Sequence, residues 1–255
     1  MKIKVLGCAG AEFPGHNPPG FLLDDEILFD AGSLTNILDE KAQIKIKNIF
    51  VTHAHLDHIR GIPFLADNII IGHWKRRVTL LSIRSVLRAI KKNLLNHSMW
   101  PDFTVIPHHR NAVLKLKHLT PGESIKVNAY SVTPYRVHHS VPATGYLVED
   151  TKGKRLFYTG DTGPSDVTWK KLGGKKIHCL IIETSFPNKM EKMAMITGHL
   201  TARLLKKELS KIQPLPERIY ITHPKPQYLE TIRRELEQLR ILNLRMLTDG
   251  ETISV

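Results

Sequence analysis

Four side chains that bind metal ions well, His53, His55, Asp57 and His58, lie within six residues of one another. They follow the apolar stretch Ile49–Thr52, which predicts a buried strand. His53 and His55 are two residues apart and can point to one side of an extended turn. Asp57 and His58 come where the turn enters a helix and can reach a second ion. Imidazoles combined with a carboxylate suit zinc, iron or manganese better than calcium.

Three later segments offer distant ligands for the same site. They are His138-His139, Asp161 and His223, and each follows an apolar strand and precedes a turn. Strand ends of this kind gather at one edge of a sheet sandwich. A carboxylate has two oxygens, so Asp161 is placed to bridge two ions. The sequence therefore predicts a centre for two divalent metal ions, with zinc expected and manganese or iron as alternatives.

This order of residues resembles the His-x-His-x-Asp-His pattern and later ligands of the metallo-β-lactamase superfamily. The resemblance implies an α/β fold, an αββα sandwich with a dinuclear site at one edge. It also implies a ligand set of His53, His55 and His139 for one ion, and Asp57, His58 and His223 for the other, with Asp161 bridging. His139 is favoured because His139–Pro142 resembles a His-Ser-Ile-Pro stretch of the nuclease branches, and His138 remains the alternative.

Five further stretches resemble class II cyclic-nucleotide phosphodiesterases. They are Asn96–Phe103, Gly160–Pro164, Glu183–Asn188, Gly198–Thr201 and Thr222–Pro226. The chain departs from that class in the compact Asn96–Trp100 spacing and in the doubled His138-His139. The resemblance implies hydrolysis of a small phosphodiester, 3′,5′-cyclic AMP or GMP, to the 5′-nucleotide. A hydroxide shared by the two ions would attack phosphorus.

Roles beyond metal binding follow from the same resemblance. His199 is the candidate proton donor to the leaving oxygen, with Glu183 holding its other ring nitrogen. The alternative is that this pair only orients a ligand. Asp57 would both bind metal and hold the nucleophile. Asp30 would accept a hydrogen bond from a ligating histidine, or would serve only as a turn residue before Gly32.

A second branch of the superfamily, the transfer-RNA 3′-processing endonucleases, shares two of these features. It too carries an acidic-Thr-x-Phe segment and a His-x-Thr element, which match Glu183 and His199. The net charge of +13 would suit RNA as a partner. Against it, no Gly/Pro-rich arm for gripping transfer RNA is evident. A metal-storing module without turnover is disfavoured, because an open dinuclear site normally holds a reactive water molecule.

The 255 residues show no composition break, so residues 1–255 are expected to form a single domain of two sheets covered by helices. Around residues 73–118 we expect a basic helical insert, where ten Lys and Arg residues face only Asp102. That insert is either a solvated surface or a wall that steers a phosphate-bearing ligand. Trp100 and Phe103 in it would stack on a base or pack in the core.

Four helices are expected. One begins at Leu34–Leu38, and the others are Val78–Asn93, Thr201–Ile212 and Leu229–Leu239. The expected strands are Ile3–Leu6, Phe21–Leu23, Ile27–Phe29, Ile49–Thr52, Val127–Val137, Gly145–Val148, Leu156–Thr159, Ile177–Glu183, Arg218–Thr222, Leu244–Leu247 and Thr252–Val255.

Two cysteines, Cys8 and Cys179, predict buried free thiols and no disulfide framework. The apolar stretch before Cys8 is too short for a signal peptide. No run approaches 18 apolar residues, so no membrane partner is expected. We therefore expect a cytoplasmic protein whose oligomeric state the sequence leaves open, a homodimer included.

Overall fold

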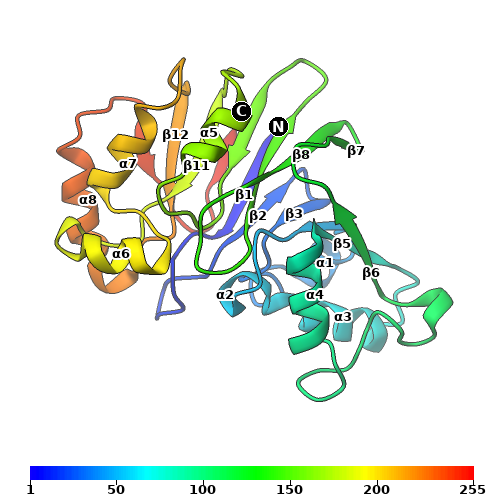
Figure 1. Cartoon of the computed structure of the whole chain (residues 1–255). Coiled ribbons are helices and arrows are strands. Elements are labelled where there is room, and N and C mark those ends of the chain that lie inside the picture. The colour runs from blue at the N-terminus through cyan, green and yellow to red at the C-terminus, as the bar shows by residue number, and fades with distance from the viewer.

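The computed structural model describes residues 1–255 and consists of two seven-stranded sheets that pack face to face, with helices on the outer faces (Figure 1). Three clusters of buried apolar side chains correspond to the three interfaces of this sandwich. One lies between the first sheet and its helices, one between the sheets, and one between the second sheet and its helices. This is the predicted αββα architecture.

The first sheet contains both ends of the chain. Its order is β14-β1-β2-β3-β4-β5-β6, so the last strand pairs with the first. The strands are β1 (Lys2–Gly7), β2 (Gly20–Leu23), β3 (Ile27–Phe29), β4 (Asn48–Phe50), β5 (Val78–Ile83), β6 (Leu114–Leu119) and β14 (Thr252–Ser254). From β3 to β6 neighbouring strands are parallel, so their carboxyl ends share one edge.

The second sheet is built from the middle and late parts of the chain, in the order β13-β12-β11-β10-β9-β8-β7. Its strands are β7 (Ile125–Val127), β8 (Tyr130–Arg136), β9 (Thr144–Glu149), β10 (Arg155–Tyr158), β11 (Cys179–Glu183), β12 (Arg218–Thr222) and β13 (Leu244–Met246). Strands β10 to β13 are parallel. Their carboxyl ends also lie at one edge, where polar side chains follow buried strands.

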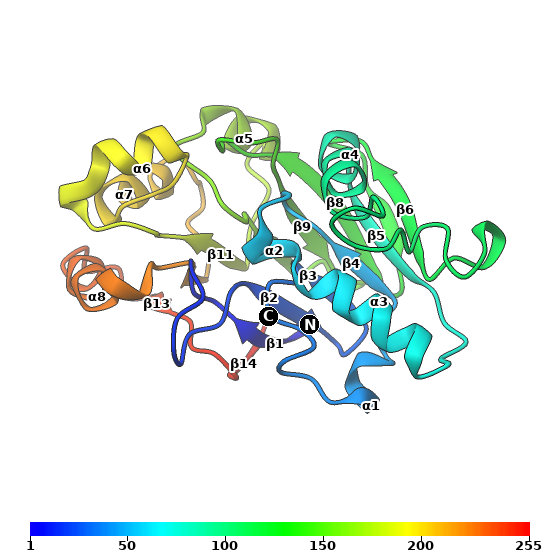
Figure 2. The same cartoon turned by 90° about the horizontal axis from the view of Figure 1, so that it is seen from below.

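Helices cover the two outer faces. They are α1 (Glu40–Gln43), α2 (Leu56–Ile59), α3 (Gly61–Ile71), α4 (Arg84–Asn93), α5 (Asp166–Leu172), α6 (Glu191–Thr197), α7 (Ala202–Leu209) and α8 (Leu229–Glu237), with short 3₁₀ turns at His109–Asn111, Asn188–Met190 and Pro226–Tyr228. The short α2 lies at the lower edge of the molecule in Figure 1 and near the middle of the view in Figure 2. None of these helices is both long enough and apolar enough to cross a bilayer.

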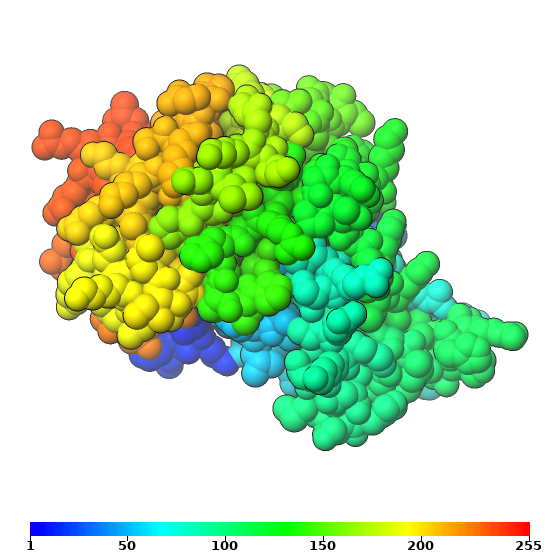
Figure 3. All heavy atoms as spheres, viewed as in Figure 1, coloured from blue at the N-terminus to red at the C-terminus, as the bar shows by residue number.

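The predicted helix Val78–Asn93 is wrong over its first six residues. Val78–Ile83 forms strand β5, which pairs with β4 and β6 in the middle of the first sheet and is buried almost throughout. Its apolar residues coincide with helical spacing because a central strand is apolar on both faces. Only Arg84–Asn93 is helical, and the segment that follows it projects at the lower right of the molecule in Figure 3.

Two other expected elements also differ. Leu34–Leu38 forms turns, and the helix begins only at Glu40, where the Asp39 side chain accepts a hydrogen bond from the backbone N–H of Ala42. Val127–Val137 is not one strand but parts of β7 and β8, which are joined by a tight turn in which Asn128 has φ 52°. A left-handed residue of this kind is typical of a hairpin turn.

Candidate metal centre

The predicted metal-binding side chains come together at the edge where the strands end. His53 and His55 lie in the loop after β4, and His58 lies in α2. His139 lies between β8 and β9, Asp161 lies three residues after the end of β10, and His223 follows β12 directly. Together with Asp57 in α2, these seven side chains form two neighbouring groups in which potential ligand atoms lie within 4.8 Å of one another.

The first group contains three imidazoles and Asp161. Nε2 of His53 lies 3.0 Å from Nδ1 of His55, and Nε2 of His139 lies 3.3 Å from the same atom. Ligand atoms 2.0–2.1 Å from a tetrahedral zinc ion lie about 3.3 Å apart. The spacing of these nitrogens therefore fits one metal ion.

The second group contains Asp57, His58 and His223. Nε2 of His223 lies 3.4 Å from Oδ2 of Asp57, and Nε2 of His58 lies 3.9 Å from it. Asp161 is within reach of both groups, because its Oδ1 lies 3.4 Å from Nε2 of His58 and its Oδ2 lies 3.7 Å from Nε2 of His53. This position fits a carboxylate that bridges two ions.

His58 provides an observation that itself points to a ligand. Its Nδ1 lies 2.8 Å from Oδ2 of Asp30 and donates to that carboxylate. Its Nε2 is completely buried and has no hydrogen-bond partner. A buried nitrogen without a partner is costly unless something binds it. Nε2 faces Asp57 and Asp161, so a metal cation fits this position.

Other ligand candidates are oriented in the same way, by one hydrogen bond to the protein. The Nδ1–H of His139 donates to the carbonyl oxygen of Gly198 at 2.9 Å, and the Nδ1–H of His223 donates to Oγ of Ser185 at 2.8 Å. Each such bond leaves Nε2 without a proton and free to bind a metal ion.

Asp30 connects several parts of this edge. Besides His58, its carboxylate accepts hydrogen bonds from the backbone N–H and hydroxyl of Thr52 and from the hydroxyl of Tyr158. Asp30 is fully buried and has φ 56°. A left-handed aspartate is uncommon, and it is held here by four surrounding hydrogen bonds. Of the two alternatives for Asp30, the structure therefore shows the hydrogen bond to a candidate ligand.

The electrostatics of the site favour a bound cation. Burial lowers the pKa of His53 well below its usual range and keeps its ring neutral. Burial alone would raise the pKa of Asp161, but the rings of His223 and His58 outweigh this effect and hold that pKa well below its usual value. His53 and Asp161 are thus in the protonation states that metal binding requires. At His58, burial is outweighed by Asp161 and Asp30, which raise the pKa of that ring well above the usual range, so an ion bound there would displace a proton.

His199 and Glu183 lie beside the two groups. Nδ1 of His199 is 2.6 Å from Oε1 of Glu183. The ring of His199 stacks on the ring of His223, with 5.4 Å between the ring centroids. Burial opposes protonation of His199, but the Glu183 carboxylate outweighs it and raises the pKa of His199. Backbone N–H groups of Thr162 and Leu200 hold Glu183 in place. The hydrogen bond from Nδ1 of His199 to Glu183 is compatible with either role for His199, a proton donor or a group that orients a ligand.

The structure shows the positions of three residues for which the sequence left alternatives open. His139, and not His138, lies with the candidate ligands. The side chain of His138 is exposed, and its backbone carbonyl accepts a hydrogen bond from the N–H of Gly163. Phe103 is buried in the core of the first sheet. Trp100 packs edge-on against Phe64 at 5.2 Å and belongs to the same apolar layer.

Sequence reasoning did not find two contributors to the site. Oγ of Ser185 donates to the carboxylate of Glu183 and also contacts Nδ1 of His199 and of His223. At Gly10, a Cβ atom would lie 2.3 Å from the carbonyl oxygen of His223, so only glycine fits there. Ser185 lies two residues after Glu183, a spacing that could have indicated a shared role.

The loop that contains Gly10 is itself fixed by the end of the chain. The carboxylate of Asp249 accepts hydrogen bonds from the backbone N–H groups of Cys8 and Asn17. The carbonyl of Cys8 in turn accepts the N–H of His223 at 2.6 Å. His223 has φ 64°, a second left-handed non-glycine residue at this edge. The N-terminal loop therefore holds the last candidate ligand in place.

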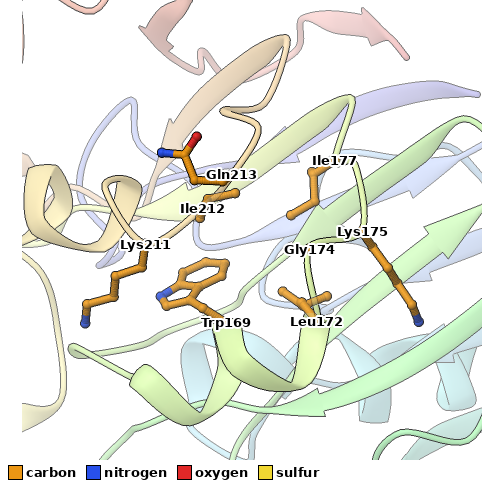
Figure 4. A pocket seen from close by; sticks show the side chains of 8 residues that line it. All are labelled: Trp169, Leu172, Gly174, Lys175, Ile177, Lys211, Ile212 and Gln213. Carbon is orange, nitrogen blue, oxygen red and sulfur yellow. The ribbon is translucent and has the colours of Figure 1, made fainter.

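A separate small cavity lies away from this edge, between α5 and the turn after α7 (Figure 4). It is lined by residues such as Trp169, Leu172 and Ile212, and by none of the predicted site residues. We assign it no role in the site.

Comparisons with known proteins agree with this geometry. A family model described as a beta-lactamase superfamily domain matches residues 26–223. A probable 3′,5′-cyclic-nucleotide phosphodiesterase of Yersinia pestis is 27% identical over 233 residues, which make up 82% of this chain and 64% of the relative. A ribonuclease Z of Methanococcus maripaludis is 33% identical over 163 residues, 61% of this chain and 51% of the relative. The chain thus spans less than two thirds of the length of these two relatives.

Solved structures share the fold. Unliganded yeast PDE1 superposes with a TM-score of 0.84 at 21% identity over 98% of both chains. The short form of human tRNase Z superposes with a TM-score of 0.72 at 20% identity, over 100% of this chain and 99% of the other. Membership of this family implies divalent metal ions, for which the two groups of His and Asp side chains offer ligands. On the match to residues 26–223 and the shared fold, the chain belongs to the metallo-β-lactamase superfamily.

Proposed function

We propose that the chain hydrolyses 3′,5′-cyclic nucleotides to 5′-nucleotides, with two divalent metal ions, expected to be zinc, at the described centre. His53, His55 and His139 would hold one ion, and Asp57, His58 and His223 the other, with Asp161 between them. The observation that carries the hydrolysis of a phosphodiester is the position of His199. This imidazole, held by Glu183, lies next to Asp161 and His223 and can supply a proton where a bond to phosphorus breaks.

Divalent ions at such a centre polarise phosphoryl oxygens and lower the pKa of a water molecule toward about 7. The chain contributes the rest. Asp57 is the more exposed of the two carboxylates and accepts a hydrogen bond from the attacking water. Asp30 fixes the ring of His58, and Ser185 fixes the ring of His223.

The leaving 3′ oxygen needs a proton as its bond to phosphorus breaks. His199 delivers that proton from Nε2, since its Nδ1 is held by Glu183. The Glu183 carboxylate raises the pKa of His199 and so favours the protonated ring that this step needs. The reaction then yields the 5′-nucleotide with a free 3′ hydroxyl.

Relatives support the cyclic-nucleotide substrate. The phosphodiesterases of Yersinia pestis and Aliivibrio fischeri are 27% and 28% identical over 82% and 83% of this chain, and a ribonuclease Z of Archaeoglobus fulgidus is 22% identical over 94% of it. The second candidate function is cleavage at the 3′ end of transfer-RNA precursors. It is supported by the 33% identity to the ribonuclease Z of Methanococcus maripaludis and by the net charge of +13.

A paired assay separates the two functions. Purified protein, analysed for its metal content, is given cyclic AMP, cyclic GMP and a precursor transfer RNA in parallel. We expect turnover of at least one cyclic nucleotide and none of the RNA. Cleavage of the RNA alone would overturn the first proposal and support the second.

A further inference from the structure

A cavity of about 350 Å³ opens beside the metal centre, between α2 and α4. His55 lies on its border, so the cavity is continuous with the candidate ligands. Val86, Ala89 and Ile90 of α4 form one wall, and Met99 lies opposite in the loop that follows this helix. Its size is within the range of pockets for small molecules.

The chemistry of the lining excludes the phosphate group as the occupant. Helix α4 carries four cations, Arg84, Arg88, Lys91 and Lys92, yet none of them lines the cavity, and neither does any carboxylate. Nine of its thirteen lining residues are hydrophobic. A phosphate group would lose its hydration there without a cationic partner. The cavity therefore suits a neutral, largely apolar part of a substrate whose phosphate lies at the metal centre.

Two polar side chains give the cavity directional contacts. Ser85 and Asn93 both line it and stand four residues before and after Ala89, so the three lie along one face of α4. Both are exposed. The amide of Asn93 offers a donor and an acceptor side by side, a pattern that matches the edge of a nucleobase. The small Ala89 between them leaves room for a flat ring.

We propose that this cavity is the base subsite: it receives the nucleobase of the substrate against Ala89 and Met99, and Asn93 hydrogen-bonds the edge of the base. Methionine is an adaptable side chain that makes favourable contacts with aromatic rings. Trp100 and Phe103, which the sequence offered as rings to stack on a base, are instead packed in the apolar layer, so Ala89 and Met99 form the surface next to the base. The inference rests on the proposed function and names the part of the substrate that gives it specificity.

The substitution Ala89→Leu tests the subsite by filling it. We expect KM for the cyclic nucleotide to rise at least tenfold. Turnover of methyl ribofuranoside 3′,5′-cyclic phosphate, which has the same ring and phosphate but no base, is expected to change less than twofold. Lys206→Leu, which adds a leucine at an exposed position of α7, is the matched control and is expected to change neither substrate. Equal losses on both substrates, or no loss on the cyclic nucleotide, would overturn the proposal.

A second substitution addresses Asn93 without filling the cavity. Asn93 is exposed, so Asn93→Ala is expected to fold normally. The ratio of kcat/KM for cyclic AMP to that for cyclic GMP is expected to change at least threefold, because the two bases present different edges. An unchanged ratio would overturn the role of Asn93.

Binding measurements separate a failure of this inference from a failure of the proposed function. Calorimetry with adenosine 5′-monophosphate and ribose 5-phosphate requires no turnover. The wild-type protein is expected to bind the nucleotide at least tenfold more tightly, and Ala89→Leu to remove that difference. If the protein hydrolyses no cyclic nucleotide but shows this difference, the base subsite stands and the proposed reaction falls. Equal affinities for the two compounds in the wild type would overturn the subsite itself.

Discussion

Nδ1 of His58 lies 2.8 Å from Oδ2 of Asp30, and both side chains are completely buried. This contact joins the end of β3 to α2 and fixes which ring nitrogen of His58 carries the proton. The other ring nitrogen of His58, Nε2, then has no hydrogen-bond partner and faces the candidate metal centre. The pair is the clearest example here of a residue that acts on a candidate ligand through a single hydrogen bond.

Replacing Asp30 by asparagine tests that role. The amide keeps the shape of the carboxylate but loses its charge, so the ring of His58 is held less firmly and binds metal less well. We expect the affinity for the divalent ion to fall about 10–100-fold, measured by titration against a chelating dye. Asp25→Asn, in the exposed turn between β2 and β3, is the control. An unchanged affinity in Asp30→Asn would show that the hydrogen bond serves only the fold.

Asp161→Ala tests the bridging position. Both oxygens of Asp161 face candidate ligands, so in the proposed centre its removal would take a ligand from each ion at once. We expect turnover to fall at least about 100-fold and the metal content per chain to decrease, as measured by elemental analysis. Asp166→Ala, at the exposed start of α5, is expected to change neither quantity. Full activity in Asp161→Ala would contradict the bridging assignment.

His199→Ala separates a proton donor from a residue that only orients a ligand. A proton donor matters most when the leaving group is a poor one, such as the 3′ alkoxide of cyclic AMP. We expect about a 10²–10⁴-fold loss of kcat on cyclic AMP and a much smaller loss on a diester with a nitrophenyl leaving group. Equal losses on the two substrates would support the orienting role instead.

Glu251 provides a prediction of pH-dependent stability that is independent of the metal centre. Burial would raise the pKa of Glu251, but hydrogen bonds from Arg245 and from the N–H of Thr248 outweigh it and lower that pKa below 4.5. A carboxylate with a lowered pKa adds stability above its unfolded-state value and loses it as the pH falls. We expect Glu251→Gln to cost up to about 1 kcal/mol at pH 7, and the difference from wild type to shrink below pH 4.5 in urea unfolding. A difference that does not depend on pH would contradict the ionic contribution of Glu251.

Much of the sheet scaffold could be predicted because buried strands leave strong local signals. The hairpin of β2 and β3 and the strands β9 to β12 lie close to their predicted positions. The candidate metal-binding residues stood out for a related reason: each group of them comes after such a strand. Helix and strand were confused at Val78–Ile83, where a fully buried strand has no alternation to distinguish it.

The remaining features depend on contacts between residues far apart in the chain. Helix α3 has an apolar sequence with little difference between its faces, so periodicity did not indicate it. Ser185 and Gly10 act on His223 across 38 residues or more, and no local pattern marks such a contact. The same holds for the cavity beside α4, which exists only once Met99 folds back toward His55.

The hydrogen bonds that link Asp249 to Cys8 and Cys8 to His223 make the position of one candidate ligand depend on a residue close to β14. The backbone N–H of His223 is held by the carbonyl of Cys8, and the loop at Cys8 is held in turn by the carboxylate of Asp249. The donor set that includes His223 would therefore be in place only after the segment that contains Asp249 has been synthesised and has folded against the loop at Cys8. Shortened products that end ahead of Asp249 should consequently emerge as metal-poor proteins, even though every donor is already present in them.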